Sequence, residues 1–279
     1  MTVGIVGLGL IGGSLAKAYK TGGNTVFVQN RTDSVADYAI LTATADGKLS
    51  PDTIGLCDLI IISLYPEASV KWLEDNAPYV RKGGLVTDAC GVKRYVCERC
   101  FPIANEYGFV FFGAHPMAGT HFSGYKYSRS TMFNGAPMVV VPPEDCGEDL
   151  KERIKEAFAP LALGRIEFTT ANNHDRMIAY TSQLAHVVSN AYIKSPSSYS
   201  HSGFSAGSFR DLTRVAWLNE TMWTELFLEN RDYLGSEIGF IIDRLAEYKA
   251  ALDDNDPEKL RVLLRDGRIA KELSEKSIK

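Results

Sequence analysis

The sequence predicts an α/β domain of the Rossmann type followed by an all-helical domain. Over residues 1–170, short β-rich apolar runs alternate with helical or loop stretches, a pattern typical of a parallel sheet covered by helices. A glycine-rich turn directly follows the first of these runs. Beyond Ala171 the β-rich runs stop, and long segments with helical periodicity take over. We therefore expect a dinucleotide-binding domain over residues 1–170 and a helical domain over residues 171–279.

Each expected strand is a short apolar run that leads into a turn or a helical stretch. In chain order the runs are TVGIVG (2–7), TVFVQN (25–30), LIIISLYP (59–66), GLVTDAC (84–90), FVFFGAHP (109–116), APMVVVPP (136–143) and GRIEFTT (164–170). The helical segments of the second domain are expected at 173–193, 208–216 and 221–252, and a loop rich in Ser and Gly (194–208) joins two of them.

Composition narrows the class of partner. The chain has 279 residues, 45% of them hydrophobic, with a formal charge of -4, which argues against binding nucleic acid or an anionic membrane. No apolar run reaches the roughly 18 residues that span a bilayer, and the opening residues run straight into a strand pattern, so we expect a cytoplasmic protein. The five cysteines offer a single short spacing, Cys97-x-x-Cys100, without a second ligand pair, so we expect inert thiols and no metal.

The glycine-rich turn has the spacing of a dinucleotide-binding loop. Gly7, Gly9 and Gly12 form G-x-G-x-x-G between the first strand and the first helix. In such a loop the glycines provide a tight turn, a close approach to pyrophosphate and close helix–strand packing, while helix N–H groups face the phosphates. The alternative interpretation is a glycine turn with a purely structural role.

The end of the second strand bears on the choice of cofactor. An NAD-preferring site would carry Asp or Glu here, whereas this chain has Asn30, Arg31 and Thr32, which suit a 2′-phosphate better. NADP is therefore favoured over NAD, although an Arg31 that is solvated or stacked on adenine would leave the choice open. The residues expected to contact the cofactor are Gly7, Gly9, Leu10, Ile11, Gly12, Asn30, Arg31, Thr32, Ser63 and Leu64.

His115 is the candidate catalytic base. The run FVFFGAHPMAG places it where a strand passes into a glycine-containing loop, and open α/β sheets bind ligands at the carboxyl ends of their strands. An imidazole with an ordinary pKa of about 6.5 is suited to accept a proton near neutrality. Its position alone leaves a structural histidine as an equal alternative.

A polar stripe marks the first helix of the second domain. At 100° per residue, Asp175, Ser182 and His186 point within about 20° of one another on an otherwise apolar helix. Such a stripe is expected either to make buried bonds at a dimer interface or to line the substrate cleft.

Four motifs in this order identify a family resemblance. GLGLIGGS, HPMAGTHFSGY, NHDRMIAYTSQLAH and FRDLTRVAWLNETMW resemble those of the prephenate and arogenate dehydrogenases of tyrosine biosynthesis, over nearly the whole chain. The resemblance implies NAD(P)-dependent oxidative decarboxylation of prephenate to 4-hydroxyphenylpyruvate, or of arogenate to tyrosine. It also implies a homodimer formed through the helical domain, with the active site in the cleft between the two domains.

The resemblance also implies residue roles. His115 would accept the proton of the ring 4-hydroxyl while hydride leaves C4. Arg214 would bind the ring carboxylate as a bidentate clamp, with Arg210, one helical turn earlier, as a weaker candidate. The remaining residues expected to contact substrate are His186, Ser182, Trp223 and His121.

The chain departs from the family pattern at several positions. Gly91 in DACGVK stands where the family usually has a serine that touches the catalytic histidine, and Cys90, Ser63 or a water could replace that hydroxyl. Gln183 and Ala185 replace residues that are commonly His and Pro. The rival functions are a β-hydroxyacid dehydrogenase or imine reductase, and a catalytically inactive NADP-binding protein.

Overall fold

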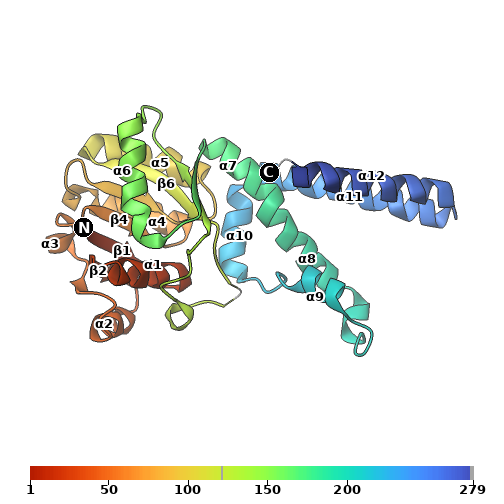
Figure 1. Ribbon diagram of the computed structural model, residues 1–279, viewed down its shortest axis with the longest axis horizontal. Coiled ribbons are helices and arrows are strands. Elements are labelled where there is room, and N and C mark those ends of the chain that lie inside the picture. The colour runs from red at the N-terminus through yellow and green to blue at the C-terminus, as the bar shows by residue number, and fades with distance from the viewer. Residues whose placement is uncertain (121, 277–279) are drawn as a thin grey trace. The chain divides into compact units, whose positions relative to one another are not determined.

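The computed structural model describes residues 1–120 and 122–276 (Figure 1). His121, expected to contact substrate, lies outside the described residues. The chain divides into two compact units, Met1–Arg231 and Asp232–Lys279, which are described separately below.

An eight-stranded sheet in the order β3-β2-β1-β4-β5-β6-β7-β8 forms the centre of the first unit. Each of the seven runs expected to be strands forms one, and the two-residue β3 is an addition at the edge. The predicted Rossmann-type fold is thereby confirmed. The strands are β1 (Thr2–Val6), β2 (Thr25–Gln29), β3 (Gly47–Lys48), β4 (Leu59–Ile62), β5 (Leu85–Asp88), β6 (Val110–Pro116), β7 (Pro137–Val141) and β8 (Arg165–Phe168).

The central strands are apolar because helices cover both faces of the sheet. Ile5 and Ile61 belong to one buried cluster, together with residues of α1 (Leu10–Thr21), α2 (Asp33–Leu41) and α6 (Glu148–Phe158). Ile60 and Ile62 belong to a second cluster, with residues of α3 (Pro51–Ile54), α4 (Pro66–Asn76) and α5 (Arg94–Tyr107). Strands buried on both faces lose the polar alternation of a half-exposed strand, which explains runs such as LIII in β4.

One strand pair departs from the parallel sheet that the sequence predicts. All neighbouring strands in the described sheet pair in parallel except β6 and β7, which are antiparallel. A parallel connection needs a crossover, usually a helix. Residues 122–136 instead contain a short 3-10 turn at Tyr125–Tyr127, and the following strand β7 returns along β6. This segment contacts α1, where Lys17 Nζ donates to the Ser128 carbonyl at 2.9 Å and the Arg129 N–H donates to Ser14 Oγ at 3.0 Å.

Helices follow the sheet, as the sequence predicts. In the first unit these are α7 (Ala171–Ile178), a π-helical segment (Ala179–Leu184), α8 (Ala185–Ile193), α9 (Gly207–Thr213) and α10 (Glu220–Glu229). The boundary at residue 170 coincides with the change from strand to helix, whereas the compact units divide after Arg231. The boundary between nucleotide-binding and substrate-binding domains therefore stays a prediction.

The second unit is a pair of helices, α11 (Arg231–Asp253, starting one residue before the unit) and α12 (Pro257–Lys276). Asn255 has a φ of 52° in the short turn between them, and Tyr248 Oη donates to the Leu263 carbonyl at 3.3 Å. Across the described residues, none of the helices has both the length and the apolar character to span a membrane.

Candidate active site

The three glycines of the loop after β1 have different environments. Gly7 has a φ of +88°, and a Cβ on it would lie 2.5 Å from the Ser63 carbonyl oxygen. A Cβ on Gly12 would lie 1.8 Å from the Gly7 carbonyl oxygen, so only glycine allows α1 to pack this closely. A Cβ on Gly9 would meet nothing within 4 Å, and no side chain caps the start of α1 there. The first N–H groups of α1 are therefore available to an anion.

The neighbouring residues expected to contact the cofactor support or border this loop. Asn30 Oδ1 accepts the Leu8 N–H at 2.9 Å, and Asn30 Nδ2 donates to the Thr32 carbonyl at 3.1 Å, so the Asn30 side chain holds the loop. Arg31 and Thr32 are exposed beside it. Leu10 and Ile11 open α1, and Ser63 and Leu64 lie against Gly7.

The acidic residues nearest to this corner are paired with a lysine. Lys48 Nζ lies 2.8 Å from Asp37 and 3.8 Å from Asp33, both on α2. The carboxylates of the first turns of α2 therefore have a cation of their own, and Arg31 is the cation that follows β2 directly.

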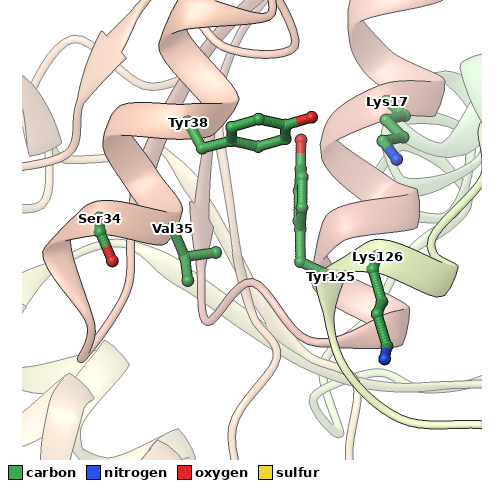
Figure 2. A pocket seen from close by; sticks show the side chains of 6 residues that line it. All are labelled: Lys17, Ser34, Val35, Tyr38, Tyr125 and Lys126. Carbon is green, nitrogen blue, oxygen red and sulfur yellow. The ribbon is translucent and has the colours of Figure 1, made fainter.

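A cavity of about 540 Å³ lies between α1, α2 and the 3-10 turn (Figure 2). Tyr38 and Tyr125 meet edge to face in it, with ring centroids 6.1 Å apart. None of the residues expected to contact cofactor or substrate lines it, so it is not the candidate site. Its lining residues are Lys17, Ser34, Val35, Tyr38, Tyr125 and Lys126.

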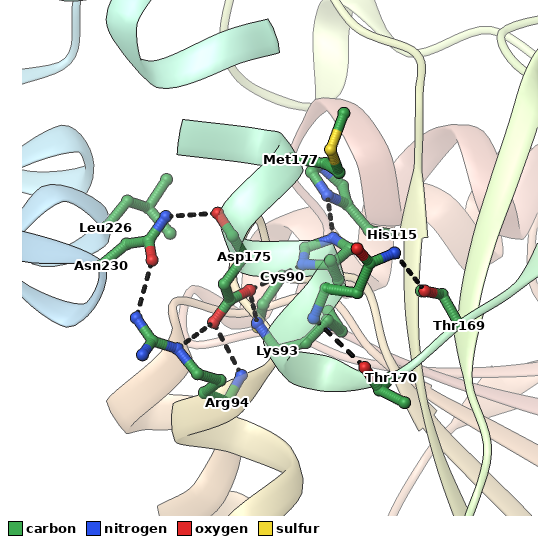
Figure 3. A network of polar contacts seen from close by, with 12 residues as sticks. Cys90, Lys93, Arg94, His115, Thr169, Thr170, Asp175, Met177, Leu226 and Asn230 are labelled. Atoms are coloured by element: carbon green, nitrogen blue, oxygen red, sulfur yellow. Dashed lines mark hydrogen bonds and ion pairs between the residues drawn. The ribbon is translucent and has the colours of Figure 1, made fainter. Parts of the chain in front are cut away.

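His115 lies at the end of β6 and meets a histidine that the sequence analysis missed. His115 Nδ1 is 2.9 Å from His174 Nε2, and His174 Nδ1 is 2.7 Å from Asp175 Oδ1 (Figure 3). His174 and Asp175 are buried in α7, whereas His115 is half-buried. The three side chains form one hydrogen-bonded row that ends at His115.

Asp175 is held by the start of α5. Its carboxylate accepts the backbone N–H groups of Lys93 at 2.7 Å and Arg94 at 2.9 Å, and Arg94 Nε lies 3.3 Å away. Burial alone raises the pKa of Asp175, but the hydrogen bond from His174 and those two N–H groups outweigh it, so the pKa is lowered. Asp175 is therefore an ionised carboxylate at the N-terminus of a helix, where negative charge is stabilised.

A buried ion pair lies behind this row. Lys93 Nζ contacts Asp88 Oδ2, and both side chains are fully buried. Asp88 also accepts the N–H groups of Cys90 at 2.9 Å and Ala114 at 3.2 Å. Although burial disfavours the charge on Lys93, the attraction of Asp88 outweighs it and raises the pKa of Lys93. A positive charge is therefore fixed near the end of β6.

These surroundings keep His115 neutral. Burial lowers the pKa of His115 well below its usual value, and the neighbouring His174 and Lys93 lower it further. Burial also lowers the pKa of His174, against the opposing effect of Asp175. An unprotonated imidazole near neutral pH is the form that a general base requires.

A second cluster contains the residues expected to contact substrate on the helical side. His186 Nδ1 lies 2.9 Å from the Val215 carbonyl oxygen, and the His186 ring lies against Trp223 with centroids 4.1 Å apart. Burial lowers the pKa of His186, and the charge of the nearby Arg214 also lowers it. Arg214 follows α9 and is exposed, as is Arg210. Among the described residues, no hydrogen bond joins this cluster to His115.

The helix that carries the polar stripe is not regular. Its six π-helical residues, Ala179–Leu184, shift the direction of every later side chain, so the common face expected for Asp175, Ser182 and His186 does not hold. Gln183 takes the buried position instead. It donates through Nε2 to the Leu226 carbonyl at 3.0 Å and accepts from Asn230 Nδ2 at 2.8 Å, whereas Ser182 is half-buried.

Gly91, at the position of the family serine, packs against a side chain of α10. A Cβ on Gly91 would lie 3.3 Å from Cδ1 of Leu226, which belongs to α10. The Cys90 thiol contacts Ser69 Oγ at 3.4 Å and the Leu64 carbonyl at 3.5 Å, and burial raises its pKa well above the usual value. Cys90 is therefore a neutral thiol with partners of its own, and the hydrogen-bond partner that the structure gives His115 is His174.

Over residues 1–120 and 122–276, no three His, Cys, Asp or Glu side chains are grouped as metal ligands would be.

Comparisons with known proteins point to one family. Residues 15–164 match the family model described as prephenate dehydrogenase, nucleotide-binding domain, and residues 170–266 match the prephenate dehydrogenase dimerization domain. A cyclohexadienyl dehydrogenase from Zymomonas mobilis is 28% identical over 268 residues, covering 92% of this chain and 90% of the relative.

Solved structures share the fold. An arogenate dehydrogenase from Synechocystis is 24% identical with a TM-score of 0.81, covering 98% of this chain and all of the other. A prephenate dehydrogenase from A. aeolicus, solved with hydroxyphenyl propionate and NAD+, is 24% identical with a TM-score of 0.84, covering 98% and 97% of the two chains. An imine reductase from Streptomyces aurantiacus has a TM-score of 0.51 and 17% identity, covering 91% and 78%, so the rival enzyme class is not favoured.

Proposed function

The chain belongs to the prephenate dehydrogenase family, and from that premise we propose that it oxidatively decarboxylates prephenate, with arogenate as the close alternative. The observation that carries the proposal is the placement of His115 at the carboxyl end of β6, hydrogen-bonded to His174 and with a lowered pKa, in the same sheet as β1, which leads into the glycine loop. The bound nicotinamide supplies the hydride acceptor, and the protein supplies the base and the positioning groups.

The glycine loop fits a dinucleotide. Gly9 leaves room for close backbone approach, the first N–H groups of α1 face outward without a side-chain cap, and Gly12 allows α1 to start close to β1. These features suit a pyrophosphate at the start of α1. Gly7, Leu10, Ile11, Ser63 and Leu64 border the same loop, and we propose all of them as cofactor contacts.

His115 accepts the proton of the ring 4-hydroxyl. As that proton leaves, the C4 hydrogen departs as hydride and the ring carboxylate is lost as carbon dioxide, so the ring becomes aromatic. Burial lowers the pKa of His115, so that the imidazole is an unprotonated acceptor.

Arg214 binds the ring carboxylate, since a guanidinium forms two parallel bonds to a carboxylate. The support is its exposure and its charge near His186, which stacks on Trp223 in the same cluster. Ser182, His186, Trp223 and His121 complete the proposed substrate contacts, and Arg210 is the alternative clamp.

NADP is the proposed preferred cofactor, with NAD as the alternative. The support is the exposed Arg31 two positions after β2, where Asn30 stands directly after the strand in place of a carboxylate that would hold a bare ribose or repel a phosphate. Asn30 contributes by holding the loop in shape, and Thr32 offers a hydroxyl beside Arg31.

A homodimer formed through the helical domain is the proposed assembly. The second matched domain is described as a dimerization domain, and α11 and α12 carry large apolar side chains on their surface. Apolar patches of this kind are typical of protein interfaces. The exposed large apolar residues of the two helices are Phe240, Ile242, Leu245, Leu252, Val262, Leu264, Ile269 and Leu273. We also propose a cytoplasmic location, which suits five unpaired cysteines.

The test is a panel of prephenate and arogenate against NADP and NAD, followed by the absorbance of the reduced nicotinamide. His115→Asn should fold and bind cofactor but lose about 10²–10⁴-fold in turnover, because the amide cannot accept the proton. Absence of turnover in the wild-type protein with every combination would refute the dehydrogenase proposal and favour the inactive NADP-binding protein. Near-normal turnover of a folded His115→Asn would refute the base.

A further inference from the structure

The row His115, His174 and Asp175 has a direction that its donors and acceptors determine. The ionised Asp175 carboxylate can only accept, so the proton between it and His174 belongs to His174 Nδ1. In a neutral His174, Nε2 is then unprotonated and can only accept. The bond at 2.9 Å between His174 Nε2 and His115 Nδ1 therefore needs its proton on His115 Nδ1.

We infer that His174, oriented by Asp175, is a positioning residue that fixes His115 as the tautomer with its proton on Nδ1 and its lone pair on Nε2. The inference rests on the proposed function for the role of His115 as base. The tautomer itself follows from the hydrogen-bond geometry and does not depend on the substrate.

Several hydrogen bonds hold Asp175 and His174 in place. Two backbone N–H groups at the start of α5 hold the Asp175 carboxylate, and Asn230 Nδ2 donates to the Asp175 backbone carbonyl at 2.8 Å. Arg94 Nη2 donates to Asn230 Oδ1 at 2.9 Å, which links the outer parts of the network. His174 itself is 2% exposed. A partner held in this way fixes both the ring orientation and the tautomer of the group that it contacts.

The hydrogen bonds of the row can also persist after His115 has accepted a proton. When His115 takes a proton on Nε2, its Nδ1–H remains a donor to His174 Nε2, and the Asp175 carboxylate lies beyond in the same line. The negative charge offsets part of the cost of forming an imidazolium near the fixed charge of Lys93. Gly91 offers no hydroxyl, and the hydrogen-bond partner that the structure gives His115 is His174.

The first measurement is made on the wild-type protein without substrate. Long-range ¹H–¹⁵N spectra of protein labelled at its five histidines report which ring nitrogen carries the proton, and His115→Asn identifies the His115 signals. We expect a protonated Nδ1 and an unprotonated Nε2 on His115 above neutral pH. A proton on Nε2 would overturn the inference, whether or not the protein turns over prephenate.

The second measurement uses a matched pair of variants. His174→Gln places an amide oxygen near the position of Nε2 and can still accept from His115, whereas His174→Phe keeps a ring but cannot accept. We expect His174→Phe to lower kcat about 10- to 100-fold with little change in the Kd of NADP, and His174→Gln to recover most of the loss. Equal losses in both variants, with His115 keeping its Nδ1 proton, would show a merely structural role.

The two proposals fail separately. A wild-type protein that does not oxidise prephenate or arogenate but shows His115 protonated on Nδ1 would refute the function and keep the tautomer. A wild-type enzyme that is active, with His115 protonated on Nε2, would keep the function and refute the positioning role. If His174→Phe does not fold, the wild-type spectrum and His174→Gln still decide.

Discussion

The burial and the hydrogen bonds of the ion pair Lys93–Asp88 predict how much its loss would lower the free energy of unfolding. Lys93→Met keeps the length of the side chain and removes its charge, so that Asp88 stays behind without its cation. Both side chains are fully buried, and removal of one partner from such a pair typically costs about 3–5 kcal/mol. Asp88 keeps the N–H groups of Cys90 and Ala114, so we expect the lower end of that range, about 3 kcal/mol.

The assay is the free energy of unfolding from urea titration, with an exposed pair as control. Lys71 and Asp75 form an i,i+4 pair at 2.6 Å with side chains 66% and 56% exposed, so solvent screens the pair and Lys71→Met should change the free energy of unfolding very little. The double variant Asp88→Asn with Lys93→Met should cost clearly less than the sum of the single variants, because no charge is left unpaired. A Lys93→Met cost as small as that of Lys71→Met would refute the reasoning.

Three further predictions concern cofactor, substrate and pH. Arg31→Ala should raise the KM for NADP about 10- to 100-fold and leave the KM for NAD nearly unchanged, because a hydrogen bond to a charged group contributes about 1.5–3 kcal/mol. Equal changes of the two KM values in steady-state kinetics would remove the argument for NADP. Arg214→Lys should weaken substrate binding while the Kd of the cofactor stays constant, because lysine keeps the charge but lacks the planar guanidinium that binds a carboxylate through two bonds. If cofactor binding weakens equally, Arg214 has a structural role instead. Burial, with Glu225 and Asp175 nearby, raises the pKa of Glu229 to about 8, so the folded state holds the proton more tightly and stability falls as pH rises from about 4.5 to about 8. Glu229→Gln should therefore raise Tm at about pH 8.5 and much less at about pH 5, and an equal effect at both values would contradict a protonated Glu229.

The strands and the glycine loop could be predicted because each depends on a short stretch of local sequence. Each strand run is apolar over several residues, and the glycine spacing follows β1 directly, so periodicity and turn chemistry suffice to find them. The direction of β7 could not be found in this way. Its run PMVVV fits either orientation, and the choice depends on where residues 117–136 pack, which is a tertiary property.

The π-helical turn has a similar cause. The sequence through Ala179–Leu184 contains no proline or glycine to mark an irregular turn. Gln183, which lies in this π-helical segment, forms hydrogen bonds with Leu226 of α10 and with Asn230, which directly follows α10. A helix considered alone therefore predicted a regular stripe, whereas tertiary hydrogen bonds select which side chains are buried.

His174 was missed because its partner is distant in sequence. His174 and Asp175 are adjacent in the motif NHD, yet an imidazole next to a carboxylate on a helix is common and carries little information by itself. Its contact with His115 spans 59 positions and exists only because the end of β6 meets the start of α7. The sequence shows that Asp175 is next to His174, but it does not show that His174 contacts His115.

Two departures from the family pattern are parts of one packing arrangement. Gly91 and Gln183 are far apart in sequence, but Leu226 contacts both: its side chain lies where a Cβ on Gly91 would point, and its carbonyl accepts from Gln183. Gln183 also accepts from Asn230, which donates to the Asp175 carbonyl. A Cβ at position 91 would require the Leu226 side chain to shift by a few tenths of an ångström. Leu226 therefore links the packing at position 91 to the hydrogen bonds around Gln183, Asn230 and Asp175, so both departures belong to one contact network.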